Sequence, residues 1–379
     1  MAVLAQGAVV TVDRRDFLKA AAAFGALPPL AGTRPWPARS RWPGYEEAVV
    51  IDFLGSPGYF NYPEARPMDE QMIRNAAASG ITAMNVTVSS GDFEGSVRRA
   101  SEWLDQVSAR PDVFRQVRTL DELMAAKKDG QVGIVFGFQD TTPYGQDLSR
   151  IDTFHDMGVR VTQLTYNVRN LVGDGCLEPG NAGLSTFGHA VVERLNETRT
   201  LVDLSHCGQR TTAEGIAASR VPASITHSGC NAVEAHPRSK NDTELRALAD
   251  GGGVVGIYLM PFLTPGRVPT AADVFDHIEH ALNVCGEEHV GIGSDLSISP
   301  IDGSDEYWSK HREFVSRRIA AGIAAPAEDP DVLFTVPDLN SHRRMEMIAD
   351  GLAARGHSDR VVEGVIGGNW LRLCREVWG

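Results

Sequence analysis

The chain contains few cysteines, and their spacing forms no paired motif. Only five cysteines occur among its 379 residues, at positions 176, 207, 230, 285 and 374. A small secreted domain held together by disulfides would carry many more, at closer intervals. The sequence therefore predicts no disulfide framework, and a fold of this length has to rely on a hydrophobic core.

Long apolar runs, internal repeats and an excess of positive charge are also missing. The body of the chain has no stretch approaching the roughly 18 apolar residues of a membrane span, so we expect no span in the mature chain. The formal net charge is −13, which argues against nucleic acid or an anionic membrane surface as the main partner. With 42% hydrophobic residues, the composition is typical of a single large globular domain.

Apolar, β-branched runs recur along the chain and alternate with helix-like segments. Several runs are apolar throughout, as parallel strands buried on both faces require. Eight runs are the number that a closed (β/α)₈ TIM-type barrel needs. An open, doubly wound sheet is the alternative, but no Gly-rich phosphate loop follows the first run. The predicted strands are Ala48–Asp52, Ile81–Val88, Val132–Phe138, Val159–Tyr166, Leu201–His206, Ala223–His227, Val254–Met260 and His289–Asp295.

Helices are predicted between these runs from their 3.6-residue periodicity. Examples are Asp69–Ser79, Ser149–Met157, Thr186–Asn196, Thr211–Ser219, Thr243–Ala249 and Ala271–Val284. A long insert at about 297–338 follows the last strand, is rich in Pro, Asp and Arg, and reads as irregular. Inserts of this kind at a barrel mouth usually shape or cover the site. His277 and His280 are expected on the outer face of the last of these helices.

Three predicted strands end on side chains that commonly bind metals. Val202–His206 and Ile225–Ser228 each deliver a histidine, and Gly291–Asp295 delivers an aspartate. Because the carboxyl ends of barrel strands all open into one site, these side chains are expected to meet there. Two histidines and an aspartate in that place indicate a catalytic centre.

The amino-terminal 40 residues resemble a twin-arginine export signal followed by a linker. Arg14 and Arg15 precede Phe17-Leu18-Lys19, and the weakly hydrophobic, Ala-rich stretch Ala20–Leu30 comes next. This order predicts a periplasmic or otherwise exported protein whose residues 41–379 form one barrel domain. The alternative is an Ala-rich amphipathic helix in which the arginines are incidental.

Eight motifs, in consistent order from about Ala48 to the C-terminus, resemble the membrane (renal) dipeptidase family, peptidase family M19. They are Leu164–Asn167 with Asn170, Gly173–Gly175, Gly183–Ser185, Val202–His206, Thr226–Ser228, His236–Arg238, His289–Asp295 and Gly367–Arg372. The resemblance implies a metal-dependent (β/α)₈ barrel related to amidohydrolases that hydrolyses dipeptides, including those with a D-residue in the second position. It also implies a small-molecule or dipeptide substrate, and a homodimer as in many bacterial members.

The resemblance assigns roles to four residues. His206 and His227 match the two strand-end histidines that hold one zinc ion in the family, consistent with the preference of zinc for imidazole. Asp295 matches the aspartate that touches the metal centre and handles the proton of the attacking water. Arg238 matches the arginine that pairs with the C-terminal carboxylate of the dipeptide, a task that suits a guanidinium group.

The chain departs from the family pattern at four other positions. Leu54 and Ser56 stand where a His-x-Asp arm binds the second metal, and Gln139 replaces the glutamate that bridges both metals. Tyr166 lies near a position where the family has a histidine that stabilises the oxyanion. Without the aspartate of the His-x-Asp arm and the bridging glutamate, the mutual repulsion of two divalent cations about 3.5 Å apart is not offset. We therefore expect no binuclear centre.

These departures leave one zinc ion per chain as the expected metal content, with partial occupancy or an empty site as the alternatives. His206 and His227 would be its ligands, completed by water and by Gln139 or Asp295. Three functions fit: an exported dipeptidase-like hydrolase with Asp295 as general base; a non-hydrolytic enzyme acting on a peptide-derived metabolite through Tyr166 and Asp295; and a non-catalytic peptide-binding protein that retains Arg238.

Overall fold

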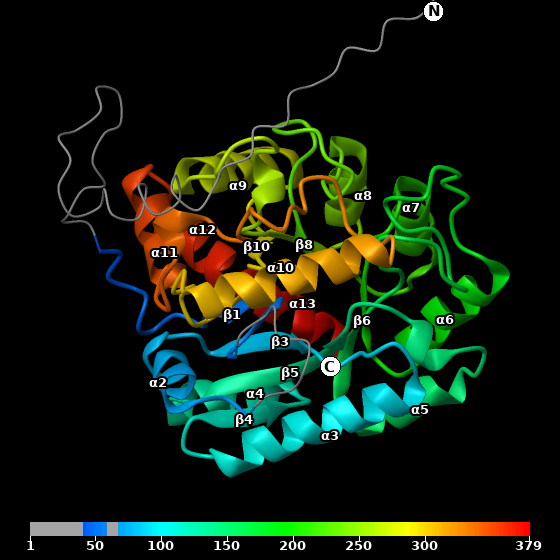
Figure 1. The fold of residues 1–379 in the computed structure, drawn as a ribbon, viewed down its shortest axis with the longest axis horizontal. Coiled ribbons are helices and arrows are strands. Elements are labelled where there is room, and N and C mark those ends of the chain that lie inside the picture. Colours follow the sequence, from blue (N-terminus) through cyan, green and yellow to red (C-terminus); the bar gives the residue numbers. More distant parts are fainter. Residues whose placement is uncertain (1–40, 59–66) are drawn as a thin grey trace, which may run out of the picture.

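A computed structural model describes residues 41–58 and 67–379 of the chain (Figure 1). The predicted export signal and linker therefore lie outside the described residues. Among the described residues, no helix combines the length and the apolar character needed to cross a bilayer.

Eight parallel strands close into a barrel, as the sequence predicts, and the alternative of an open sheet is wrong. The order β3-β1-β10-β9-β8-β7-β6-β5 returns to its start through a β3–β5 pairing. Each strand coincides with one of the eight predicted runs, and β8 alone extends beyond its run, by one residue. In chain order they are β1 (Ile51–Asp52), β3 (Ala83–Thr87), β5 (Val132–Phe138), β6 (Val159–Gln163), β7 (Leu201–Asp203), β8 (Ser224–Ser228), β9 (Val254–Ile257) and β10 (Val290–Ile292).

Two additions to the barrel were not predicted from the apolar pattern of the sequence. Strand β4 (Phe114–Val117) pairs in parallel with the first half of β5, below the point where β6 begins to pair with the second half. At the barrel mouth, β2 (Gly55–Ser56) and β11 (Leu296–Ser297) form a two-stranded sheet just beyond β1 and β10. This small sheet holds Ser56 at the rim of the site.

Helices surround the strands (Figure 1), and the six predicted examples are confirmed to within two residues at each end. Side-chain caps fix several starts, including the capping box of Asn241 and Glu244 on α8. The main helices are α2 (Glu70–Ala78), α3 (Phe93–Ala109), α4 (Leu120–Asp129), α5 (Ser149–Asp156), α6 (Thr186–Glu197), α7 (Gln209–Ala218), α8 (Asp242–Asp250), α9 (Ala271–Cys285), α10 (Asp305–Ala320), α11 (Arg344–Ala354), α12 (Asp359–Glu363) and α13 (Asn369–Trp378).

The insert at about 297–338 is not irregular throughout, which corrects the sequence prediction. It contains the 16-residue helix α10, whose start is capped by the Ser304 hydroxyl accepting from Tyr307 N–H. Charged residues dominate this helix, so its weak apolar stripe gave little periodic signal. Figure 1 shows α10 crossing in front of the barrel strands.

The prediction for His277 is also wrong, because its side chain is fully buried. His277 Nδ1 accepts from Cys230 N–H at 2.9 Å, and its Nε2 lies 3.3 Å from the carbonyl of Leu263. The ring therefore satisfies backbone groups inside the barrel wall, whereas His280 is half-buried and pairs with Asp242.

The C-terminal helix α13 packs aromatic surface against the barrel. Trp370 is completely buried, stacks on Phe53 with ring centroids 4.5 Å apart, and donates its indole N–H to the carbonyl of Ile292 at 3.0 Å. The contact ties β1, β10 and α13 into one core. This part of the barrel supplies stability, and the opposite, carboxyl ends of the strands are left for a site.

Candidate active site

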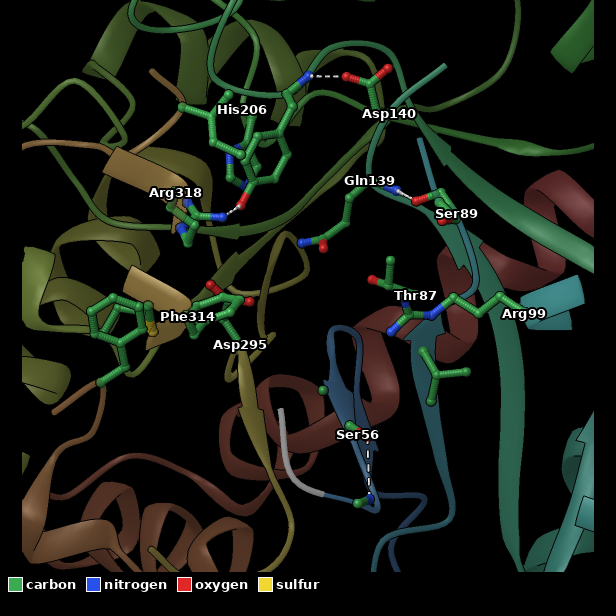
Figure 2. Close-up of a pocket in the computed structure, with 18 of the residues that line it drawn as sticks. Ser56, Thr87, Ser89, Arg99, Gln139, Asp140, His206, Asp295, Phe314 and Arg318 are labelled. Carbon is green, nitrogen blue, oxygen red and sulfur yellow. Dashed lines mark hydrogen bonds between the residues drawn. The ribbon is translucent and has the colours of Figure 1, made fainter. Parts of the chain in front are cut away.

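A cavity of about 1000 Å³ opens at the carboxyl ends of the barrel strands. Its wall combines strand ends with residues of α3 and of the insert, so the prediction that the insert shapes the site is confirmed. Figure 2 shows several of these side chains converging on the open space. Those used below are Ser56, Thr87, Arg99, Gln139, Tyr166, His206, Arg238, Asp295, Arg318 and Glu328.

His206 and His227 face each other across the ends of β7 and β8. Their Nε2 atoms are 2.8 Å apart, and both side chains are buried. His206 Nδ1 lies 2.6 Å from Asn167 Oδ1, and His227 Nδ1 lies 2.8 Å from Thr226 Oγ1. The Thr226 hydroxyl donates to the Asp203 carboxylate, which leaves its oxygen to accept from His227.

The side-chain amide of Asn167 likewise presents its oxygen to a histidine. Its Nδ2 donates to the carbonyl of Ile323 at 2.7 Å, so its oxygen is the atom that faces His206. Both rings therefore carry their proton on Nδ1 and direct an Nε2 lone pair at the same point. Burial lowers the pKa of His206 and of His227 well below the usual range, and the nearby Arg238 guanidinium lowers both further.

Asp295 lies at the end of β10 in a left-handed backbone conformation, with φ of 57°. Its N–H donates to the carbonyl of Leu54 at 2.8 Å, which fixes the turn. Among the described residues, no group hydrogen-bonds to the buried Oδ1 atom. Burial raises the pKa of Asp295 to about 7, against the opposing effects of Arg238 and Arg318. A carboxyl of this kind can accept or release a proton near neutral pH.

Arg238 reaches the cavity from the loop after β8. Its side chain is buried, and its guanidinium donates to the carbonyl of Ser205 at 2.6 Å and to that of His227 at 3.4 Å. Neither partner is charged, and no carboxylate within the described residues pairs with it. The cation is therefore held in place by the ends of β7 and β8 with its charge uncompensated.

Tyr166 stacks on His206 with ring centroids 4.1 Å apart. Its hydroxyl accepts from Arg318 on α10 at 2.9 Å, and Arg318 in turn forms a two-pronged ion pair with Glu328. The side chains of Arg318 and Glu328 are 13% and 2% exposed, so this pair is buried in the cavity wall. Sequence reasoning missed both residues, because they lie in the insert and belong to no recognisable motif.

Of the three positions at which the sequence departs from the metal ligands of the family pattern, two line the cavity, and among the described residues the three offer no second set of charged ligands. Ser56 and Gln139 line the cavity, and the Gln139 amide points into it (Figure 2), whereas Leu54 is buried. Within the described residues, no group of three or more His, Cys, Asp or Glu side chains is arranged to hold a metal ion. A centre with two metal ions would therefore lack carboxylate ligands within the part of the chain that the structure describes.

Comparisons with known proteins agree with the geometry. The family model for membrane dipeptidase, peptidase family M19, matches residues 92–316. Dipeptidase verJ of Clonostachys rogersoniana is 29% identical over 262 residues, which cover 69% of this chain and 59% of that protein. Dipeptidase aclJ of Aspergillus oryzae is 34% identical over 203 residues, covering 52% of this chain and 48% of its own length. The chain thus spans about half the length of these curated relatives.

A solved structure gives broader coverage. An amidohydrolase from Pseudomonas aeruginosa is 30% identical, with a TM-score of 0.76, over 88% of this chain and 98% of its own. The family match covers more than half of the chain, and the eight-stranded barrel and the strand-end histidines agree with it. This chain belongs to the membrane dipeptidase family, peptidase family M19.

Proposed function

We propose that this protein is a dipeptidase-like hydrolase that cleaves dipeptides or related small amides in the cavity at the barrel mouth. The observation that carries the proposal is the convergence of His206, Asp295 and Arg238 on one cavity, with the buried His227 in contact with His206. A cation-binding pair, a proton acceptor and a carboxylate-binding group are the parts that amide hydrolysis requires.

We propose at most one zinc ion per chain, held by His206 and His227. The support is that both Nδ1 atoms are hydrogen-bonded to neighbouring oxygens, which leaves the two adjacent Nε2 atoms available to a shared cation. Two imidazoles fall short of the three protein ligands usual in catalytic sites. When bound, zinc polarises a carbonyl oxygen and lowers the pKa of water.

The remaining roles belong to the side chains themselves. Arg238 binds the C-terminal carboxylate, because its buried guanidinium still has N–H groups to donate. Asp295 Oδ1 takes the proton of the attacking water and passes it to the leaving amine. The Tyr166 hydroxyl, positioned by Arg318, stabilises the negative charge that develops on the carbonyl oxygen.

Two substitutions test this assignment against the alternatives of a non-hydrolytic enzyme and a peptide-binding protein. Asp295→Asn keeps the shape but removes the proton acceptor, so turnover should fall by about 10²- to 10⁴-fold with little change in affinity. Arg238→Met should weaken binding of peptides with a free C-terminus and leave amidated peptides unaffected. A dipeptide panel that includes D-residues and amidated C-termini measures both. Binding without hydrolysis of any member would overturn the hydrolase and favour one of the alternatives.

Export by the twin-arginine route is a separate proposal, supported by Arg14, Arg15 and the Ala-rich stretch that follows. Replacing both arginines with lysine should leave the precursor in the cytoplasm, and fractionation of cells that express the full chain measures this. Export unaffected by the double substitution would contradict the proposal. A homodimer also stays a prediction, which sedimentation of the purified chain would test.

A further inference from the structure

Arg99 is a cation in the cavity wall that the proposed mechanism does not use. It extends from α3, and Figure 2 shows its guanidinium group beside Thr87, on the side of the cavity away from His206 and Arg318. Its Nε atom is buried and has no hydrogen-bond partner within residues 41–58 and 67–379. Glu102, one turn along the same helix, is the acidic residue whose charge acts on it, and it forms no ion pair with Arg99 in the described structure.

The other described cations of this wall all have partners. Arg169 pairs with Asp174, Lys310 with Glu306 and Arg318 with Glu328, while Arg238 donates to the carbonyls of Ser205 and His227. Arg99 is half-buried, and a buried N–H donor such as its Nε, left without a partner among the described residues, is unfavourable for the free protein. Residues that are costly in this way are typical of positions at which a ligand supplies the missing partner.

The surroundings of Arg99 are suited to hydrogen bonding with a ligand. Thr87, Ser56 and Gln139 line the cavity with it and contribute hydroxyl and amide groups. The cavity volume of about 1000 Å³ lies at the upper end of the range for small-molecule sites, so a ligand longer than a minimal dipeptide can reach both sides.

We propose that Arg99 binds a second carboxylate of the substrate, so that the enzyme acts on acidic dipeptides or acyl-amino acids that carry an anionic group on the N-terminal side. The proposal rests on the proposed function, in which Arg238 binds the C-terminal carboxylate. A guanidinium group at each side of one cavity then orients the scissile amide between them.

Two nearly isosteric dipeptides, Glu-Ala and Gln-Ala, test the proposal by isothermal titration. The titrations use the full chain carrying Asp295→Asn, so that the peptides are not consumed. We expect Glu-Ala to bind about 10- to 100-fold more tightly, the range for a hydrogen bond to a charged group. Arg99→Gln should bring the ratio close to one, and Arg99→Lys should restore part of it. Arg98→Gln, an equal charge change at an exposed neighbour on α3, is the matched control. An unchanged ratio in Arg99→Gln would overturn the proposal.

A second measurement separates failure of this inference from failure of the proposed function. If neither dipeptide binds, the dipeptidase proposal is wrong, and Arg99 is tested by thermal unfolding of the same variants in glutarate and in inorganic phosphate. Glutarate should raise the melting temperature of the parent chain and of Arg98→Gln, and it should not raise that of Arg99→Gln. An equal response in all variants, no response in any, or a response to phosphate alone would each contradict a carboxylate subsite at Arg99.

Discussion

The ion pair between Arg318 and Glu328 allows a quantitative test of how α10 is held to the loop that follows it in the insert. In Glu328→Gln the carboxylate is lost, while the Arg318 guanidinium keeps its charge in a site where it is only 13% exposed. Removing one partner of a buried ion pair typically costs about 3 kcal/mol, since the other charge is left uncompensated. For a domain of this size the melting temperature should fall by roughly 5 °C.

The assay is urea denaturation of the parent chain, Glu328→Gln, Arg318→Met and the double variant. This cycle should give a coupling free energy of at least about 1.5 kcal/mol. Asp331→Asn is the matched control, because Asp331 pairs with Arg312 between the same helix and the same loop, but both side chains are about half exposed. We expect that change to cost less than about 0.5 kcal/mol. A coupling below about 0.5 kcal/mol, or equal effects at Glu328 and Asp331, would refute the view that the buried pair holds α10 to the loop after it.

Three further predictions concern metal content and pH. Elemental analysis of the purified chain should give at most one zinc, and two tightly bound metals would show that ligands outside those described complete the centre. The triple change Leu54→His, Ser56→Asp and Gln139→Glu should raise the metal content towards two and increase dipeptide hydrolysis, and no gain in either would show that the mouth has been rebuilt. Burial lowers the pKa of His277 to about 4, so the unfolded chain binds its proton first as the pH falls. The stability advantage over His277→Gln should be complete above pH ~6.5 and shrink by up to about 3 kcal/mol towards pH 4, as measured by urea denaturation, and a pH-independent difference would contradict this.

The barrel itself was predictable because its signal is local. A parallel strand buried on both faces has to be apolar along its length, as in β5 (Val132–Phe138), and each such run stands out against the polar helices beside it. Strand β4 was missed because two of its four residues, Arg115 and Gln116, are polar and only half-buried, so the run has no continuous apolar character. Helix α10 was missed for a similar reason, since charged residues cover most of its surface and hide its apolar stripe.

The residues of the candidate site also fall into those that the sequence could predict and those that it could not. His206, His227 and Asp295 were predictable because each ends a recognisable strand, and barrel geometry then places strand ends together. Arg99 and Arg318 were not, because each lies on a helix with ordinary charge and becomes special only through the tertiary contacts of its side chain. No spacing rule indicates which arginine of a helix turns towards a cavity and which, like Arg98, faces solvent.

The stacking of Trp370 on Phe53 has a consequence for how this family changes over time. It secures the strands through apolar contacts in the core, apart from the side chains at the mouth that carry the chemistry. Side chains of the cavity wall, such as Ser56 and Gln139, can then be exchanged without loss of the scaffold. In an architecture built this way, a change at the mouth leaves a folded starting point from which selection can shape a new specificity.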